Sequence, residues 1–262
     1  VAAVHAQMQR LTAAANSFTS GPQQALARQL AERFPVRDAR CFLGSSGTEA
    51  TEAAIKLAVR ATGRSVIVAF ERAFHGRSLG ALSLTANTAY RHPYVRCIDE
   101  SEPSNPFAVA QVLRLPWGDL AAVRAAFTEM GSQIAGVFVE PVQGEGGVMA
   151  LDPEYVQAVR ALCDEKDLVL IVDEVQTGMG RCGAVLASPL AGLDPHVVCL
   201  AKGLAGGLPA GAVVWRGDLG DFAPHSHGST CGGNPVVCRV ALEAFRLLEE
   251  GLPERGAALG EG

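Results

Sequence analysis

The chain has 262 residues, of which 48% are apolar, and a formal net charge of −5. This length suits one large α/β domain or one and a half ordinary domains, with enough apolar residues for a sizeable core. The acidic balance argues against a nucleic-acid or membrane-surface partner. The longest apolar runs, such as Leu168–Val172, are too short to cross a bilayer.

Strand-like and helix-like segments alternate along the sequence. In chain order we predict helices over 1–11, 23–34 and 48–61, a strand over 65–70, a helix over 120–130, a strand over 134–140, a helix over 153–166, strands over 168–173, 197–201 and 210–215, and a helix over 235–250. Such βα repeats are typical of parallel sheets. We therefore predict an α/β fold with a mostly parallel sheet and helices on both faces.

The seven cysteines form no Cys-x-x-Cys pair. Their odd number and scattered spacing favour reduced thiols in a cytoplasmic protein over a disulfide framework. A zinc site built from cysteines with His225 or His227 is less favoured than the alternative, in which the cysteines are small buried apolar side chains. We predict no metal site.

The most informative residue is Lys202, which lies in an apolar, glycine-rich stretch downstream of a strand ending at Asp173. An apolar setting lowers the pKa of an amine towards the neutral form that attacks carbonyl groups. An acid such as Asp173 could keep the ring nitrogen of pyridoxal phosphate protonated and make that ring an electron sink. Most lysines are solvated surface charges, so it is the pair in this order that favours imine chemistry.

Asp173 ends an apolar run in which an unpaired carboxylate would be unusual. A pyridinium partner would satisfy it, and Gln176 could bond the hydroxyl of the same ring. The alternative is that Asp173 caps a loop. Glu174 is a less specific neighbour.

Two glycine-rich segments precede predicted helices. Gly44–Ala50 offers backbone N–H groups and the Thr48 hydroxyl to an anion at a helix start, although an ordinary helix cap explains it as well. It is neither a Walker motif nor a GxGxxG loop. Residues 227–235 supply Ser229 and Thr230, which could bind a phosphate, including that of a second subunit. Alone, the Asn-Pro pair there indicates only a helix start.

Further candidates follow two other predicted strands. Phe74, His75 and Arg77 combine an aromatic face, an imidazole and a guanidinium. A planar cofactor could stack on Phe74 or His75, and Arg77 could bind a carboxylate through two hydrogen bonds. The alternative places Phe74 in the core and Arg77 in a surface ion pair. Glu140 and Glu145 come after a strand, where α/β folds place their ligands.

Six motifs in order resemble the class III (ω-amino) aminotransferases of the fold-type I pyridoxal-phosphate enzymes. They are SSGTEATEAAIKLA, FHGRSLGALS, VEPVQGEGGV, VDEVQTGMGR, LAKGLAGGLPAGA and HGSTCGGNP, and they extend over nearly the whole chain. The likeness is greatest to the acetylornithine and ornithine types of arginine biosynthesis. It implies the large domain of that fold, pyridoxal phosphate as cofactor, and ping-pong transfer of an ω-amino group from N-acetylornithine or a related ω-amino acid to 2-oxoglutarate.

The resemblance also implies residue roles. Lys202 resembles the lysine that forms an imine with the cofactor and carries a proton between the substrate carbon and C4′. Asp173 matches the partner of the pyridine nitrogen, and Gln176 the ring-hydroxyl contact. The other implied cofactor contacts are Gly47, Thr48, Phe74, His75, Glu174, Val175 and Thr230. Thr230 matches a residue that reaches the phosphate in the neighbouring subunit of a homodimer.

With Glu140 from the strand-end argument, the predicted substrate contacts are Arg77, Glu140, Glu145 and Ser229. By resemblance, Arg77 binds the α-carboxylate so that the distal amine faces the cofactor. Glu145 resembles a glutamate that masks a second arginine while the ω-amine is bound and releases it for 2-oxoglutarate.

The sequence departs from the family at several positions. Ser45 and Thr51 replace two asparagines, and Cys182 and Cys231 stand where other residues are common. We expect a fragment, with 1–35 as the N-terminal helical part, 36–250 as the cofactor-binding domain and 251–262 as the start of a linker to an absent small domain. We expect it to keep most cofactor groups but to turn over poorly, above all with 2-oxoglutarate.

The sequence also fits other functions. The amino donor could instead be ornithine, succinylornithine, a carrier-bound lysine or 4-aminobutyrate, and a glutamate-semialdehyde aminomutase is a more distant relative. A truncated domain that binds the cofactor and dimerises without turnover is a different class of answer. A nicotinamide-dependent reductase is disfavoured because its glycine fingerprint is absent.

Overall fold

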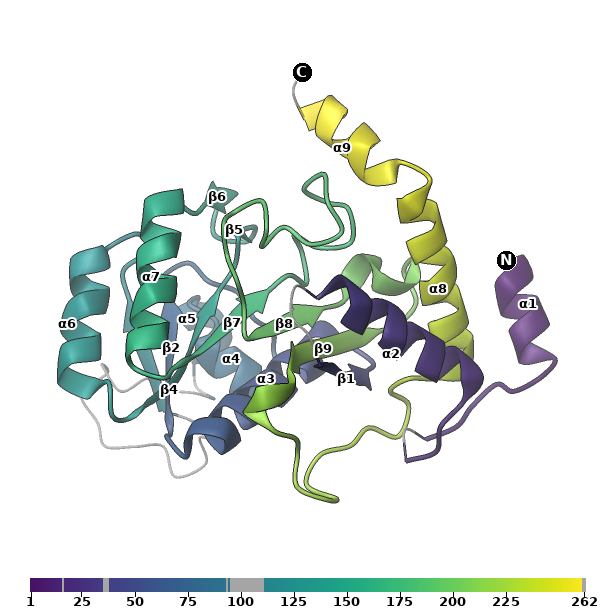
Figure 1. Cartoon of the computed structure of the whole chain (residues 1–262), viewed down its shortest axis with the longest axis horizontal. Coiled ribbons are helices and arrows are strands. Elements are labelled where there is room, and N and C mark those ends of the chain that lie inside the picture. Colours follow the sequence, from purple (N-terminus) through teal and green to yellow (C-terminus); the bar gives the residue numbers. More distant parts are fainter. Residues whose placement is uncertain (16, 35–37, 93, 95–110, 261–262) are drawn as a thin grey trace. The chain divides into compact units, whose positions relative to one another are not determined.

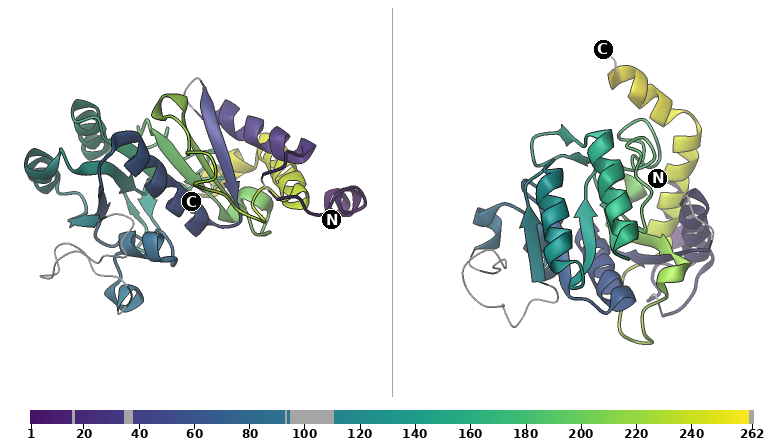
Figure 2. Two further views of the ribbon diagram at one scale, coloured as in Figure 1. Left: turned by 90° about the horizontal axis from the view of Figure 1, so that it is seen from below. Right: turned by 60° about the vertical axis from the view of Figure 1, so that its left-hand side comes forward.

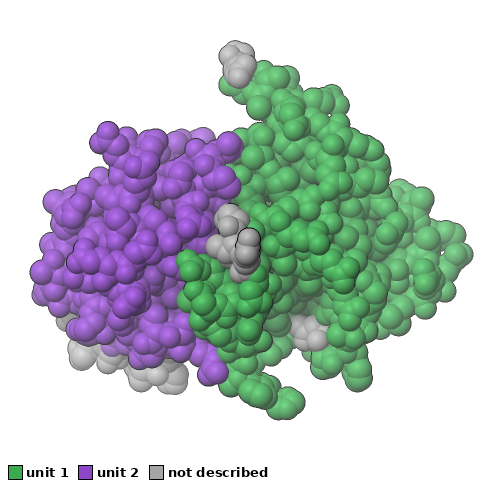
Figure 3. All heavy atoms as spheres, in the orientation of Figure 1, with its two compact units in different colours: residues 1–50, 174–187, 199–262 green, residues 51–173, 188–198 purple. Residues whose placement is uncertain are grey.

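The computed structural model describes residues 1–15, 17–34, 38–92, 94 and 111–260. The chain divides into two compact units, which Figure 3 draws in different colours. The first unit comprises residues 1–50, 174–187 and 199–262, and the second comprises 51–173 and 188–198. The backbone passes between the units at 50/51, 173/174, 187/188 and 198/199.

The second unit contains the parallel strands β2 (Val66–Phe70), β3 (Gln111–Leu115), β4 (Ile134–Val139) and β7 (Val169–Asp173). They stand in the order β7-β4-β2-β3, and the β2/β3, β2/β4 and β4/β7 pairs are parallel. Every residue of β2 and β4, and likewise of β7, is buried. This burial explains why these strands are continuous apolar runs in the sequence.

Two helices of the second unit, α6 (Leu120–Met130) and α7 (Pro153–Glu165), pack against each other (Figure 1). Each begins at an aspartate that accepts a backbone N–H of the first turn. Asp119 accepts from Ala122 at 2.9 Å, and Asp152 accepts from Glu154 at 2.9 Å. Such caps satisfy N–H groups that have no partner inside the helix, so both helix starts are fixed locally.

Short helices α4 (Leu79–Leu84) and α5 (Thr88–Arg91) follow β2. Glu52, from α3 (Gly47–Thr62), accepts two backbone N–H groups in the first turn of α4, at 2.9 and 3.1 Å. At the other end, Arg114 of β3 donates to the carbonyls of Ser83 and Leu84, at 2.9 and 3.0 Å. Because both ends of α4 are held, the segment between β2 and α4 is fixed as well.

In the first unit, β1 (Ala39–Gly44) pairs antiparallel with β9 (Gly211–Arg216). Next to β9 comes β8 (Val197–Leu200), whose last two residues belong to this unit. Two short 3₁₀ helices follow β8 and β9, namely η1 (Lys202–Ala205) and η2 (Gly217–Leu219).

The helices of the first unit gather around α8 (Pro235–Glu249). Both α1 (Ala2–Met8) and α2 (Gly21–Arg33) pack on it, and α8 buries Cys238, Ala241, Phe245 and Leu248. The three- and four-residue spacing of these side chains is that of one helix face. Beyond α8 the chain continues in α9 (Leu252–Gly260), seen in yellow in Figures 1 and 2.

The predicted α/β fold, with a mostly parallel sheet flanked by helices, is confirmed. Each predicted helix and strand has a counterpart with slightly shifted ends. The edge strands β1 and β3 were not predicted, because they are only half covered and therefore lack a continuous apolar run. Nor was α9, which lies in the stretch 251–262 that is predicted to start a linker.

The cysteines follow the prediction in part. Cys163, Cys199 and Cys238 are buried, whereas Cys231 is exposed; Cys97 lies outside the described residues. Among the helices that the structure describes, none combines the length and apolar character needed to cross a membrane.

Gly136, in β4, provides a test of the packing. A Cβ built there would lie 2.7 Å from the Val169 carbonyl oxygen and 3.4 Å from the Ala58 Cβ. We expect Gly136→Ala to lower the free energy of unfolding by about 1–3 kcal/mol, because a buried strand would have to shift. Urea denaturation measures this. Gly21→Ala is the matched control, since its Cβ would meet nothing within 4 Å; an equal loss in both variants would contradict the packing argument.

Candidate active site

In the first unit, Lys202 opens the turn η1 directly after β8. Its backbone φ is +43°, in the left-handed region that costs a non-glycine residue about 1–2 kcal/mol. Leu204 and Ala205 of the same turn are buried, whereas Lys202 is exposed. Its Nζ donates to Gln176 Oε1 at 2.9 Å. The fold therefore keeps the turn in the core and holds the amine outside it beside an amide.

The glycine-rich start of α3 lies against the residues next to this pair. A Cβ on Gly47 would lie 3.0 Å from Val175 Cγ1 and 3.3 Å from the Ala201 Cβ. Val175 precedes Gln176 in the chain, and Ala201 precedes Lys202. Contacts this short are tighter than most Cβ contacts, so a glycine suits this close approach. The predicted phosphate loop and the predicted lysine are therefore neighbours within this unit.

The predicted serine and threonine of the 227–235 segment differ in environment. Ser229 is half-buried and donates from Oγ to Glu49 Oε2 at 3.2 Å, while it accepts the Gly232 N–H at 3.0 Å. Thr230 is exposed. Ser229 thus has contacts inside the unit that its predicted role as a substrate contact did not include.

Glu174 is fully buried, and its carboxylate accepts hydrogen bonds from other residues of the protein. It accepts the Ala187 N–H at 2.6 Å and the Thr177 hydroxyl at 3.4 Å. Its own N–H donates to the Cys199 carbonyl at 2.9 Å. These bonds hold the segment that follows Asp173 and carries Val175 and Gln176.

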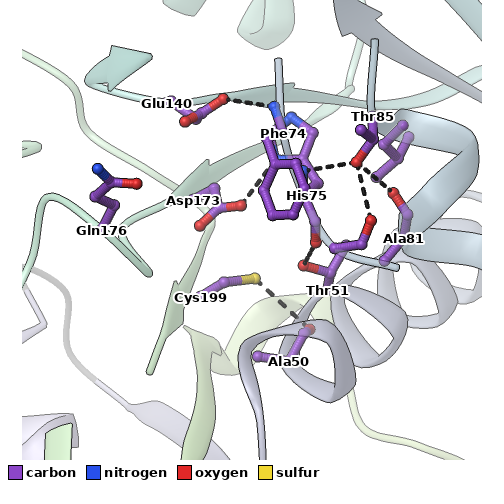
Figure 4. Close-up of polar contacts among 12 residues, drawn as sticks. Ala50, Thr51, Phe74, His75, Ala81, Thr85, Glu140, Asp173, Gln176 and Cys199 are labelled. Atoms are coloured by element: carbon purple, nitrogen blue, oxygen red, sulfur yellow. Dashed lines mark hydrogen bonds and ion pairs between the residues drawn. The ribbon is translucent and has the colours of Figure 1, made fainter. Parts of the chain in front are cut away.

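In the second unit, parallel strands place the residues after β2, β4 and β7 at one edge of the sheet. His75 Nδ1 lies 2.7 Å from Asp173 Oδ2, and both side chains are buried (Figure 4). An ionised carboxylate can only accept, so Nδ1 carries the hydrogen. A buried carboxylate requires such a partner.

The backbone of His75 is held by two threonines (Figure 4). Its N–H donates to Thr85 Oγ1 at 3.0 Å, and its carbonyl accepts from Thr51 Oγ1 at 2.9 Å. Within the described part of the chain its Nε2 is buried without a hydrogen-bond partner. The imidazole is thus held rigidly, with its Nδ1 side towards Asp173.

Glu140 follows β4 and is 6% exposed. Its Oε1 accepts the Phe74 N–H at 3.1 Å (Figure 4). Burial raises the pKa of Glu140 to about 7; the charge of His75 and the bond from Phe74 oppose this rise, and Asp173 adds to it. Glu140 therefore positions the aromatic residue that the sequence analysis places against a cofactor ring.

Arg77 is exposed and lies over two aromatic rings of the second unit. Its Cζ is 4.2 Å from the centre of the Tyr90 ring and 5.9 Å from that of Phe74. Among the described residues it has no ion pair, so the alternative prediction of a surface salt bridge finds no support there. Stacking of this kind leaves the edge of a guanidinium available for a carboxylate.

Glu145 lies in the turn of the hairpin formed by β5 (Val142–Gln143) and β6 (Met149–Ala150). It is exposed. The turn also contains Val148, a β-branched residue at φ +57°, which is an uncommon conformation for that side chain.

The structure thus brings the predicted residues together in two groups. The first unit gathers Gly47, Val175, Gln176 and Lys202, and the second gathers Phe74, His75, Glu140 and Asp173. The sequence did not predict the contacts of Thr51 and Thr85 with His75. Thr51 carried a weak signal, a hydroxyl on the otherwise apolar face of a helix; Thr85 carried none.

Comparisons with known proteins agree on one family. The class III aminotransferases match residues 1–260. An acetylornithine aminotransferase from Methanopyrus kandleri is 43% identical over 100% of this chain and 64% of its own length. A putrescine aminotransferase from Pectobacterium atrosepticum is 39% identical over 100% of this chain and 56% of its own.

A solved structure shows the same fold. Ornithine aminotransferase from Toxoplasma gondii, described with partial occupancy of PLP at its active site, has a TM-score of 0.87 and 33% identity, covering 99% of this chain and 60% of that one. The chain therefore spans less than two thirds of the length of these relatives.

Glu140 should make stability depend on pH. The folded protein keeps the Glu140 proton up to about pH 7, whereas the group ordinarily releases it near 4.5. The folded state therefore binds more protons at Glu140 in this window, and the contribution of Glu140 to stability should fall as pH rises through it. Glu140→Gln cannot ionise, so its stability relative to wild type should rise by about 1–3 kcal/mol from pH 5 to pH 8 in urea denaturation. Glu145→Gln is the exposed control; parallel curves for wild type and Glu140→Gln would contradict the expectation.

Proposed function

Because the chain belongs to the class III aminotransferases, a family of pyridoxal-phosphate-dependent enzymes, we propose that it forms the cofactor-binding part of an ω-amino-acid aminotransferase. The observation that carries the proposal is the placement of Lys202, whose exposed amine donates to Gln176 beside the glycine-rich start of α3. We propose N-acetylornithine, or a related ω-amino acid, as donor and 2-oxoglutarate as acceptor.

The residues of the first unit fit the phosphate of the cofactor. Gly47 provides a close backbone approach beside Val175 and Ala201, and the start of α3 favours negative charge. Thr48 adds a hydroxyl at this helix start. Lys202 is the covalent attachment point, and Gln176 is the contact of the ring hydroxyl.

The residues of the second unit fit the pyridine ring. Asp173 would accept from the protonated ring nitrogen, and its bond to His75 keeps its carboxylate oriented. Phe74, held by Glu140, would pack on the ring face. Bound pyridoxal phosphate supplies an electron sink that makes the substrate C–H bond acidic. Lys202 Nζ would move the proton between the substrate carbon and the cofactor.

The donor is proposed from the charge of Arg77. Its guanidinium faces no carboxylate among the described residues, and it suits the α-carboxylate of an ω-amino acid. The Methanopyrus kandleri relative is named for acetylornithine and the Pectobacterium atrosepticum relative for putrescine, which has no carboxylate. Arg77 therefore favours the former. Glu145 and Ser229 complete the proposed substrate contacts.

We further propose that the protein acts in arginine biosynthesis in the cytoplasm and forms a homodimer. In such a dimer Thr230 would donate to the phosphate bound by the neighbouring subunit. Its exposure is compatible with that role.

Covalent labelling tests Lys202. The chain has only three lysines, Lys56, Lys166 and Lys202, so borohydride reduction in the presence of pyridoxal phosphate followed by peptide mass mapping gives a clear answer. We expect a pyridoxyl group on Lys202 and none on Lys202→Ala. Lys166→Ala removes a lysine that pairs with Glu165 and should label as wild type does. Equal labelling of all three lysines would contradict the proposal.

Arg77 should discriminate between donors. With pyridoxal phosphate bound, we expect Arg77→Gln to weaken acetylornithine binding about 10- to 100-fold, because a charge-assisted hydrogen bond contributes about 1.5–3 kcal/mol. Putrescine binding should not change. Spectroscopic titration measures both, with the exposed Arg72→Gln as control. Equal effects on the two amines would exclude Arg77 as the carboxylate contact.

A further inference from the structure

The side chain of Glu49 lies between two glycine-rich loops of the first unit. One oxygen, Oε2, accepts the Ser45 N–H at 2.8 Å and the Ser229 hydroxyl at 3.2 Å. Ser45 belongs to the segment that leads into α3, and Ser229 belongs to the segment that leads into α8. A single carboxylate oxygen therefore joins two segments that are 180 residues apart in the sequence.

The first loop has little freedom around this carboxylate. A Cβ on Gly44 would lie 2.8 Å from Glu49 Oε2, and one on Gly211 would lie 2.0 Å from the Ser46 carbonyl oxygen. Ser46 Oγ in turn accepts the Glu49 N–H at 3.3 Å. Ser46 and Glu49 thus resemble a capping box, except that the carboxylate bonds to the N–H one residue earlier.

The second loop is packed against the end of β1. A Cβ on Gly232 would lie 2.3 Å from the Leu43 carbonyl oxygen. Ser229 Oγ accepts the Gly232 N–H at 3.0 Å while it donates to Glu49. The conformation of the loop that carries Thr230 therefore depends on the bond from Ser229 to Glu49.

The negative charge of Glu49 is unexpected at its position. A carboxylate in the first turn of α3 lies near the proposed phosphate site, where its Coulomb repulsion opposes the binding of an anion. A neutral side chain would avoid that repulsion. The two hydrogen bonds offer a reason for an acceptor oxygen there, since one oxygen with two lone pairs can accept from both loops, which an apolar side chain could not do.

We propose that Glu49 is a positioning residue that fixes the Ser229–Thr230 loop on the Gly44–Thr48 loop, so that both present their donors to phosphate groups. This inference rests on the proposed binding of pyridoxal phosphate. Glu49 touches neither cofactor nor substrate in this role; it acts through Ser45 and Ser229.

Binding of pyridoxal phosphate compared with pyridoxal, which lacks the phosphate, isolates the effect. We expect Glu49→Ala to lower the preference for pyridoxal phosphate about tenfold, because the loss of a charge-assisted hydrogen bond disorders the donors. Glu49→Gln should keep the wild-type preference or exceed it, because its amide oxygen can accept both bonds while the repulsion is gone. Fluorescence titration of each ligand gives the ratio of dissociation constants.

The two variants separate positioning from charge. If Glu49 acted by charge alone, Ala and Gln would both strengthen binding of the phosphorylated ligand, and that result would overturn the proposal. An unchanged ratio in Glu49→Ala would also overturn it. Glu52→Ala is the matched control, since Glu52 is on the same helix as Glu49 but its carboxylate caps α4. The ratio of dissociation constants in this variant should match that of wild type even if its stability falls.

Ser229 provides a second route, should Glu49→Ala fold poorly. Ser229→Ala should lower the same ratio, and the double variant Glu49→Ala/Ser229→Ala should lose no more than Glu49→Ala. Additive losses would mean that the two residues act independently. If the wild-type chain itself shows no preference for pyridoxal phosphate over pyridoxal, the proposed function fails, whatever the variants do.

Discussion

The 2.7 Å contact between His75 and Asp173 is the interaction on which the polar part of the second unit depends. Both side chains are buried, so each requires a partner, and the bond between them meets part of that need. The parallel arrangement of β4 and β7 and the hydroxyls of Thr51 and Thr85 hold the two residues in place. The pairing therefore rests on long-range topology as much as on local bonds.

Close backbone contact has the corresponding role in the first unit. Positions 44, 47, 211 and 232 are glycines whose added Cβ would approach other atoms to between 2.0 and 3.0 Å. At 211 and 232 the nearest atoms are backbone carbonyl oxygens, and at 44 and 47 they are side-chain atoms, so the loops are placed by close packing and by a few hydrogen bonds, such as those of Glu49. A methyl group at 211 or 232 would meet backbone carbonyl oxygens at 2.0 and 2.3 Å and could not be accommodated without a backbone shift.

The sequence predicts the sheet and much of the site because the relevant signals are local. Apolar runs mark β4 and β7, and the ordered motifs mark Lys202 and Asp173. Contacts between distant segments leave no comparable local signal. The bond from Thr51 to His75 and that from Glu49 to Ser229 join residues 24 and 180 positions apart. Likewise, nothing local indicates that the Glu174 carboxylate is buried and accepts hydrogen bonds from Thr177 and Ala187.

The backbone of Lys202 has a consequence for engineering. At φ +43° the backbone conformation costs a glycine about 1 kcal/mol less free energy than it costs a lysine. A selection for thermal resistance alone would therefore favour replacing the residue on which the proposed chemistry depends. Stability and activity make opposite demands at this position. A library of variants screened only for thermal stability would become enriched in variants that lack the amine of Lys202.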